Sequence, residues 1–241
     1  MKKHIFEDAR AIAAFLVSVF DSRLKTQEIL WLALSGGSTP REIFRTWAHE
    51  FRHHLDWKRL RFFWSDERCV PPTDAQSNFN MTHSALLEPL EINPDAVFRV
   101  RGEDAPESAC AAYSQEIEAR LPRQRGVPCF DIILLGMGAD GHTASIFPHE
   151  IELWDHSGCC VVATHPDTGQ KRVSFTGHLI NNAHEIYVVV TGREKQDMLA
   201  SVASDPHASV PLHAWTLPKR SGCWIPLLRG LYPRKQCKPT V

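Results

Sequence analysis

The segment FDIILLGMGADGHTASIFP, residues 130–148, decides which fold the chain can adopt. Its apolar half predicts a buried strand, and Gly136, Gly138 and Gly141 follow in the G-x-G-x-x-G spacing of a dinucleotide-binding turn. Such a turn is followed by a full helix and, about 20 residues later, by an acidic residue after a second strand. Here Pro148 stops the segment after HTASIF, and the polar stretch HEIELWDHSG comes next. The segment therefore predicts a loop at the end of a strand, and nicotinamide binding is not expected.

Short apolar runs alternate with helical patterns on both sides of this segment. Buried strands interleaved with helices indicate an α/β fold whose largely parallel sheet is covered on both faces. In such folds ligands bind at the carboxyl ends of the strands, where the loops carry the chemistry. A helix is expected over 193–203, after the last strand. The runs that predict strands lie at 29–35, 60–65, 96–100, 130–136, 159–164, 173–176 and 185–192.

Composition restricts the kind of partner that the chain can bind. The 27 basic and 28 acidic side chains leave a net charge of −1, so neither nucleic acid nor a membrane surface is expected as a partner. No apolar run approaches the roughly 20 residues that a membrane span requires. The seven cysteines are an odd number without a CxxC pair, which predicts reduced thiols in a cytoplasmic protein and no metal site.

The chain is expected to form one domain over residues 1–216. The final segment, 217–241, has four prolines, six basic residues and no acidic residue. This composition does not predict a packed helix, so the segment is expected to be loosely packed.

A turn over residues 35–39 is the first candidate binding element. An apolar strand ends at Ser35, Gly36 and Gly37 permit a tight turn, and Ser38 or Thr39 is expected to cap a helix. This arrangement directs backbone N–H groups and the positive end of a helix toward one point, which suits a phosphate group. A simple strand-to-helix turn is the alternative, but it does not require two glycines followed by Ser-Thr.

The end of the strand at 60–65 carries charged side chains. Asp66, Glu67 and Arg68 directly follow the strand at 60–65, and a long loop then leads to Asn78 near a helix start. Loops of that length in compact domains are often functional.

In the opening segment, Gly138 allows the backbone to approach a ligand, and His142 is expected at the start of a short helix. The helix dipole there disfavours the imidazolium and would keep a neutral base, with Asp140 orienting it or holding water. A capping or core histidine is the alternative. Arg172 and Lys195 also lie near predicted strand ends, and could supply the charged partners of a phosphate dianion.

The motifs LSGGSTP, SDERCVPPTDAQSNFNM, DIILLGMGADGHTASIFP, KRVSFT and VVVTGREK occur in the order and spacing of the 6-phosphogluconolactonases, which the chain resembles over residues 5–215. The resemblance implies hydrolysis of 6-phosphoglucono-δ-lactone in the oxidative pentose phosphate pathway. It also implies a modified doubly wound α/β fold, mainly parallel, with helices on both faces, which glucosamine-6-phosphate deaminases share.

Those deaminases are the main alternative function. They carry Asp-Glu-Tyr where this chain has Arg68 in third place, and a glutamate before the proline where this chain has Phe147. The arginine suits an acidic substrate. A sugar-phosphate sensor without turnover is a further alternative, although a sensor does not need the pair Asp140 and His142.

The resemblance also implies roles for the individual residues. His142 would be the general base that deprotonates water, with Asp140 beside it. The phosphate and ring hydroxyls would be bound by Arg68, Arg172, Lys195 and the turn over residues 36–39, and Asn78 would be structural or lie next to the substrate. Backbone N–H groups of residues 136–141, or Arg68, would stabilise the oxyanion. No cofactor or metal is expected, the partner is the small-molecule lactone, and the protein is expected to be a monomer or homodimer. The substrate-binding candidates are Gly36, Gly37, Ser38, Thr39, Asp66, Glu67, Arg68, Asn78, Gly138, Arg172 and Lys195.

Overall fold

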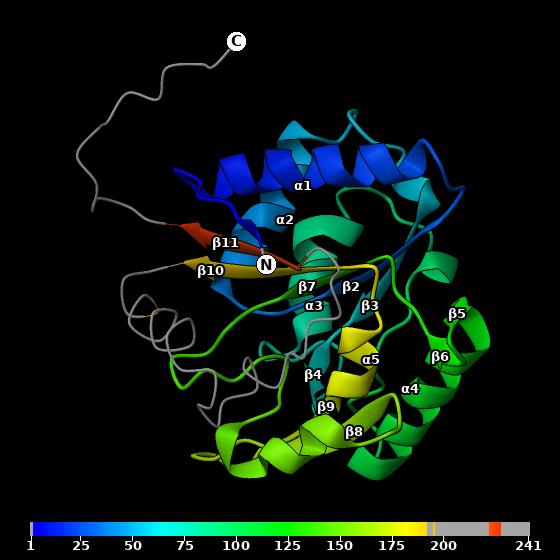
Figure 1. Cartoon of the computed structure of the whole chain (residues 1–241), viewed down its shortest axis with the longest axis vertical. Coiled ribbons are helices and arrows are strands. Elements are labelled where there is room, and N and C mark those ends of the chain that lie inside the picture. Colours follow the sequence, from blue (N-terminus) through cyan, green and yellow to red (C-terminus); the bar gives the residue numbers. More distant parts are fainter. Residues whose placement is uncertain (1, 192–194, 196–221, 228–241) are drawn as a thin grey trace.

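Two sheets of different kinds organise the chain in the computed structural model, which describes residues 2–191, Lys195 and residues 222–227 (Figure 1). Among these residues, six strands form the central sheet in the order β1–β11–β10–β7–β2–β3, and all neighbouring pairs are parallel. The prediction of a mainly parallel, doubly wound α/β fold is confirmed. The strands are β1 (Lys2–Lys3), β2 (Leu30–Leu34), β3 (Leu60–Trp64), β7 (Ile132–Leu135), β10 (Glu185–Thr191) and β11 (Gly222–Leu227).

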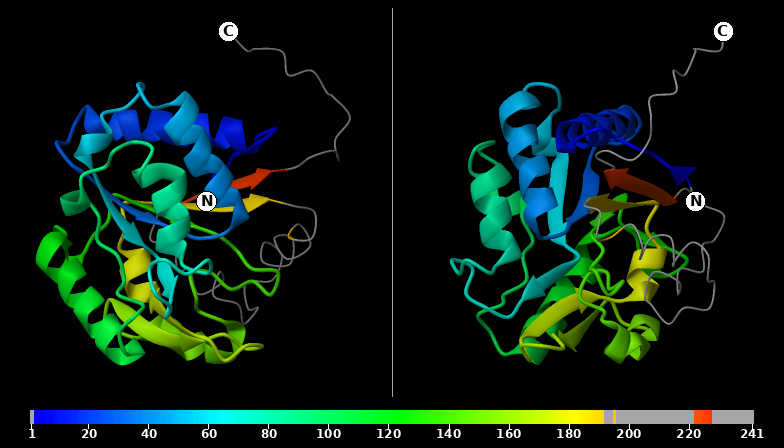
Figure 2. Two further views of the ribbon diagram at one scale, coloured as in Figure 1. Left: turned by 180° about the vertical axis from the view of Figure 1, so that it is seen from behind. Right: turned by 90° about the vertical axis from the view of Figure 1, so that its left-hand side faces the viewer.

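Helices cover both faces of the central sheet (Figures 1 and 2). Leu32 and Leu34 of β2 pack in one core cluster with residues of α1 and α2, whereas Ala33 packs in a second cluster with residues of α4 and α5. Since successive strand residues face opposite sides, a sheet buried on both faces needs unbroken apolar strands. The helices are α1 (Ala9–Leu24), α2 (Ser38–Glu50), α3 (Asn78–Thr82), α4 (Pro106–Arg120) and α5 (Gly177–Asn181), with 3-10 turns at Trp57–Arg59, Pro94–Ala96 and Pro148–Asp155 and a π-helical turn at His83–Leu87.

A small antiparallel sheet lies beside the central one, in the order β4–β9–β8. Ser65 joins the two sheets, because its N–H donates to Leu34 of β2 (2.7 Å) and its carbonyl accepts from Phe175 (2.8 Å). The runs at 159–164 and 173–176 therefore belong to this sheet rather than to a single parallel one. Its strands are β4 (Asp66–Arg68), β8 (Cys160–Thr164) and β9 (Lys171–Phe175), and a separate hairpin pairs β5 (Arg123–Gln124) with β6 (Val127–Pro128).

The expected strand at 96–100 is wrong. Only Val97 makes a bridge, to Phe62 of β3, and it directly follows the 3-10 turn that begins at Pro94. Phe98 and Val100 are still buried, 8% and 2% exposed. The apolar pattern therefore reports burial of this segment, and not a continuing strand.

The C-terminal segment contributes to the central sheet. Within 217–241, residues 222–227 form β11, which pairs with β10 along its whole length and with β1 at Cys223 and Trp224. Pro226 lies where β11 pairs with β10 alone, so its missing N–H is tolerated. The rest of 217–241 and the helix expected over 193–203 lie outside the described residues, apart from Lys195.

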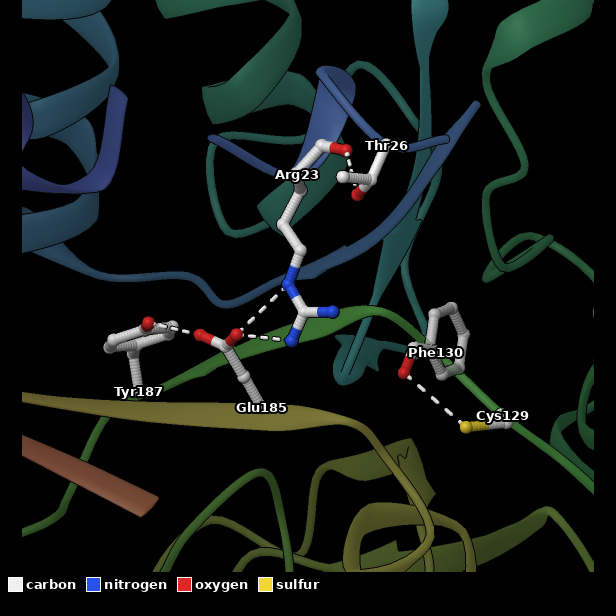
Figure 3. A network of polar contacts seen from close by, with 6 residues as sticks. All are labelled: Arg23, Thr26, Cys129, Phe130, Glu185 and Tyr187. Carbon is white, nitrogen blue, oxygen red and sulfur yellow. Dashed lines mark hydrogen bonds and ion pairs between the residues drawn. The ribbon is translucent and has the colours of Figure 1, made fainter. Parts of the chain in front are cut away.

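A polar contact ties α1 to the central sheet (Figure 3). The Nε of Arg23 in α1 donates to Glu185 Oε1 of β10 at 2.9 Å, and the Tyr187 hydroxyl donates to the other carboxylate oxygen. This fixes the helix over β10, one of the strands that lead to the candidate site. Among the described residues, no helix is both long and apolar enough to cross a membrane.

Candidate active site

A cavity of about 270 Å³ lies where the carboxyl ends of β2, β7 and β10 meet the small antiparallel sheet. Parallel strands bring their carboxyl ends to one edge of the sheet, so segments far apart in sequence meet there. Most of the predicted site residues line this cavity. They are Gly36, Gly37, Ser38, Thr39, Asp66, Arg68, Asn78, Gly138, His142, Arg172 and Lys195, and the residues not predicted are Ser35, Pro40, Gly136, Met137, Ala144 and Val189.

The turn after β2 forms one wall of the cavity. The N-cap residue of α2 is Gly37, and no side chain caps the helix, so the expected cap by Ser38 or Thr39 is wrong. Both lie inside the first helical turn instead, and Thr39 Oγ1 hydrogen-bonds Thr191 Oγ1 at the end of β10 (2.5 Å). The N–H groups at the start of this 13-residue helix therefore remain available to an anion.

Asn78 fixes this turn against the small sheet. Its amide nitrogen donates to the Asp66 carbonyl (2.9 Å), and its side chain lies so close to Gly36 that a Cβ there would come within 1.8 Å of Asn78 Oδ1. Only glycine fits at position 36 without displacing Asn78. The two residues thereby hold together the turn after β2 and the start of β4.

His142 and Asp140 form a hydrogen-bonded pair at the cavity wall. The distance from His142 Nδ1 to Asp140 Oδ1 is 2.6 Å, and the side chains are 25% and 43% exposed. When Nδ1–H donates to the carboxylate, the neutral imidazole keeps its free electron pair on Nε2, which is the form of a base. Partial burial opposes ionisation of Asp140, but the hydrogen bonds and charge of His142 outweigh it, so the pKa of Asp140 is lowered.

The loop that carries this pair is not helical. Thr143 and Ile146 form an antiparallel bridge, and Ala144 between them has a φ of 49°, outside the helical region. The expectation that His142 begins a short helix is therefore wrong, and Asp140 rather than a helix dipole sets its tautomer. A Cβ at Gly138 would lie 2.2 Å from His142 Nδ1, so glycine is required where the imidazole packs on the backbone.

Two backbone donors of this loop are already in use. The N–H of Gly138 donates to the His142 carbonyl (2.9 Å), and the N–H of Gly141 donates to the Gly138 carbonyl (3.1 Å). These two groups are not available to an oxyanion. Of the oxyanion donors expected in 136–141, only the backbone N–H groups of the other four residues remain candidates.

Arg68 and Arg172 face each other across β4 and β9 as register partners. Like charges placed opposite each other on a sheet repel. Arg172 is only 8% exposed, and this burial lowers its pKa. The charge of Asp66 opposes the shift, and the charge of Arg68 adds to it. The Nε atoms of both arginines are buried without a hydrogen-bond partner, and neither side chain forms an ion pair with any described residue. An anion in the cavity would relieve both the repulsion and the missing hydrogen bonds.

Asp66 forms no direct ion pair with these arginines, although it lines the same cavity and is 6% exposed. Its Oδ2 accepts a hydrogen bond from Ser145 Oγ at 2.7 Å. The same Ser145 Oγ accepts a hydrogen bond from Arg172 Nη1 at 3.3 Å. Ser145, which is fully buried, therefore separates the carboxylate from the guanidinium. The sequence carries no signal for this arrangement, because it requires three segments to meet.

Glu67 was expected to contact substrate but does not line the cavity. Its Oε1 accepts from the backbone N–H groups of Arg68 (2.8 Å) and Asn78 (2.7 Å), and its Oε2 accepts from Ser77 Oγ (3.0 Å) and the Phe79 N–H (2.7 Å). Burial raises its pKa against the effect of the backbone hydrogen bonds. All four donors are internal, so the contacts of Glu67 are those of an anchor for the loop before α3.

Comparison with known proteins places these features in a family. The family model for glucosamine-6-phosphate isomerases/6-phosphogluconolactonase matches residues 6–224. The 6-phosphogluconolactonase of Haemophilus influenzae is 39% identical over 192 residues, which is 79% of this chain and 81% of that protein.

Solved structures with related sequences have the same fold. The crystal structure of devB protein has a TM-score of 0.88 at 32% identity, covering 93% of this chain and 95% of that one. The structure of 6-phosphogluconolactonase from Thermotoga maritima has a TM-score of 0.80 at 26% identity, covering 93% and 99%.

Proposed function

This chain belongs to the glucosamine-6-phosphate isomerase/6-phosphogluconolactonase family, and we propose that it hydrolyses 6-phosphoglucono-δ-lactone to 6-phosphogluconate in the oxidative pentose phosphate pathway. The observation that carries the proposal is the content of one cavity. It holds the base His142, oriented by Asp140, together with the buried cation Arg172, and both Nε atoms of Arg68 and Arg172 lack a partner. A phosphorylated ester needs these two functions side by side.

Binding of the phosphate is assigned to one group of elements. The free N–H groups at the start of α2 and the cations Arg68, Arg172 and Lys195 all face the same cavity. Hydrogen bonds from these groups to a phosphate dianion are charge-assisted, so they are stronger than hydrogen bonds between neutral groups. Holding the substrate by its phosphate also fixes the position of the lactone carbonyl relative to the base, which converts binding into orientation.

The chemical step follows from the tautomer of His142. Its Nε2 removes a proton from water as the water oxygen attacks C1 of the lactone, and Asp140 stabilises the imidazolium that forms. The C1–ring oxygen bond then breaks, and the imidazolium returns the proton to the leaving ring oxygen. The product is the open-chain acid, which releases one proton when its carboxyl group ionises near neutral pH.

The deaminase function receives less support from the site. Phe147 occupies the position at which deaminases carry a glutamate, and its buried ring contacts the His142 ring at a centroid distance of 4.6 Å. No carboxylate can act from that position. The relatives from Haemophilus influenzae and Thermotoga maritima are both named 6-phosphogluconolactonase, and neither is named a deaminase.

The remaining expectations belong to this proposal. The enzyme works without a cofactor or metal, acts on a free sugar phosphate in the cytoplasm, and binds neither nucleic acid nor membrane. It acts as a monomer or a homodimer, and residues 1–216 form its hydrolase domain together with β11.

An assay of the full chain tests the proposal. Freshly generated 6-phosphoglucono-δ-lactone is added in weak buffer and proton release is recorded, while ammonia release is recorded with glucosamine 6-phosphate. Proton release above the spontaneous rate, without ammonia, is the expected result. Ammonia release would instead identify a deaminase, and binding of sugar phosphate without either product would identify a sensor.

A further inference from the structure

We propose that Ser145 is a positioning residue that keeps Arg172 available to the substrate by preventing Asp66 from pairing with it. The inference rests on the proposed function for the identity of the anion, a sugar phosphate. It adds a residue that does not line the cavity and that acts through Arg172.

Two buried opposite charges lie at the cavity without forming an ion pair. Asp66 and Arg172 are both almost fully buried, 6% and 8% exposed, and both face the cavity. A buried carboxylate and guanidinium at such close quarters would normally form a direct ion pair, because each is costly to bury alone. Here they do not, and the Ser145 hydroxyl stands between them at 2.7 Å from Asp66 Oδ2 and 3.3 Å from Arg172.

Backbone contacts hold Ser145 firmly in this position. It occupies a turn closed by the hydrogen bond from Ile146 N–H to the Thr143 carbonyl (3.0 Å), and its own N–H donates to Ser174 Oγ (3.0 Å). Ala144, directly before it, has a φ of 49°, which costs a non-glycine residue free energy. The surrounding contacts therefore maintain an unfavourable backbone conformation that places the hydroxyl at this point.

The contact between Ser145 and Asp66 affects how Arg172 binds an anion. A hydroxyl that donates to Asp66 satisfies the carboxylate with a neutral group, and leaves the charge of Arg172 unneutralised. The unpartnered Arg172 Nε remains for another acceptor. If Ser145 were removed, Asp66 could approach Arg172 and compete with the phosphoryl group for the same guanidinium.

The test compares variants of the full chain by their affinity for inorganic phosphate, measured by calorimetry, and by KM and kcat for the lactone. In Ser145→Ala, phosphate affinity is expected to fall by about tenfold and KM to rise in parallel, while kcat changes by less than about threefold. The double variant Ser145→Ala, Asp66→Asn removes the competing charge as well. It is expected to bind phosphate several times more tightly than Ser145→Ala alone, and this gain should exceed the gain that Asp66→Asn gives in the chain that keeps Ser145. A merely structural role of Ser145 would make the two gains equal.

Thr176→Val is the matched control, since Thr176 is equally buried but its hydroxyl hydrogen-bonds the backbone of Gly158 and Leu179, outside the cavity. Its phosphate affinity should change by less than about threefold. If Ser145→Ala does not fold, Ser145→Cys carries the test, because a thiol keeps the volume and only weakens the hydrogen bonds, and a loss of at least about threefold is expected.

Unchanged phosphate affinity in the folded Ser145 variant, or additive losses in the double variant, would overturn the inference. If the wild-type chain bound phosphate and showed this pattern but did not hydrolyse the lactone, the inference would hold for the anion site and the proposed function alone would fail.

Discussion

The base and the cations line one cavity, yet the chain supports them in different ways. His142 and Asp140 are two residues apart on one loop, partly exposed, and their contact is made within that loop. Arg68 and Arg172 come from different strands of a small sheet, where they meet as register partners with buried and unpartnered Nε atoms. The comparison teaches that the reactive group is built locally, whereas the binding charge is assembled by tertiary structure and kept unneutralised.

The largest effect is expected at the local end of the cavity. His142→Ala removes the base, so kcat should fall by about 10²- to 10⁴-fold while KM stays within about threefold of its original value. The measurement is steady-state proton release with the lactone. His165→Ala is the matched control, because His165 packs on the same ring of Phe147 but does not line the cavity, and it should retain nearly full activity. Full activity of His142→Ala would remove this half of the comparison.

Asp140→Asn tests whether the carboxylate sets the tautomer of the base. An amide carries no negative charge, so it neither fixes the Nδ1–H tautomer of His142 as firmly nor stabilises the imidazolium that forms. The value of kcat should therefore fall by about 10- to 100-fold. The pKa of Asp140 is lowered in the folded chain, so its ionised form stabilises folding above the unfolded pKa, and that stabilisation is lost as pH falls through the folded value. The difference in Tm between wild type and Asp140→Asn should therefore shrink as the pH is lowered from neutral into the range of carboxyl titration. A constant difference would contradict the assignment.

The sequence predicts the part of the site that is built within one loop, but not the part that is assembled from distant segments. Asp140 and His142 are visible as a motif because their contact spans two residues, and the strands are visible because a sheet buried on both faces needs unbroken apolar runs. The pairing of Arg68 with Arg172, and the insertion of Ser145 between Asp66 and Arg172, depend on antiparallel register between distant segments. Periodicity does not encode that register.

Glu67 shows the opposite error. It was expected in the site because it stands between Asp66 and Arg68 at a strand end. Alternation along β4 turns it away from the cavity that its two neighbours line, and it accepts hydrogen bonds from the N–H groups of Asn78 and Phe79 at the start of α3 instead. A charged residue next to two site residues can therefore be structural, and only its partners reveal this.

Arg172→Met tests the tertiary end of the cavity. Loss of the guanidinium should raise KM by about tenfold or more with a smaller change in kcat, since it binds rather than reacts. Because the buried charge has no ion-pair partner, an apolar side chain of similar length should leave the free energy of unfolding unchanged or higher. Arg120→Met is the control: the Arg172 guanidinium lies over the Phe147 ring (5.5 Å) and that of Arg120 over the Phe98 ring (4.7 Å), but Arg120 is outside the cavity. A large loss of stability with unchanged KM would show that Arg172 is structural.

The smallest kinetic effect is expected for Glu67→Gln. An amide can accept at only one end, so two of the four internal donors lose their acceptor, and the free energy of unfolding should fall by about 2 kcal/mol. Urea unfolding measures this change. KM should rise less than in Arg172→Met, and a larger rise would return Glu67 to the binding site.

A crystal structure of the chain with 6-phosphogluconate bound tests the central claim most directly. The account predicts that the phosphoryl group lies within hydrogen-bond distance of the start of α2 and of at least one of Arg68, Arg172 and Lys195, and that the C1 carboxylate faces Nε2 of His142. A phosphoryl group bound away from these cations, or an imidazole that does not contact the product, would contradict it.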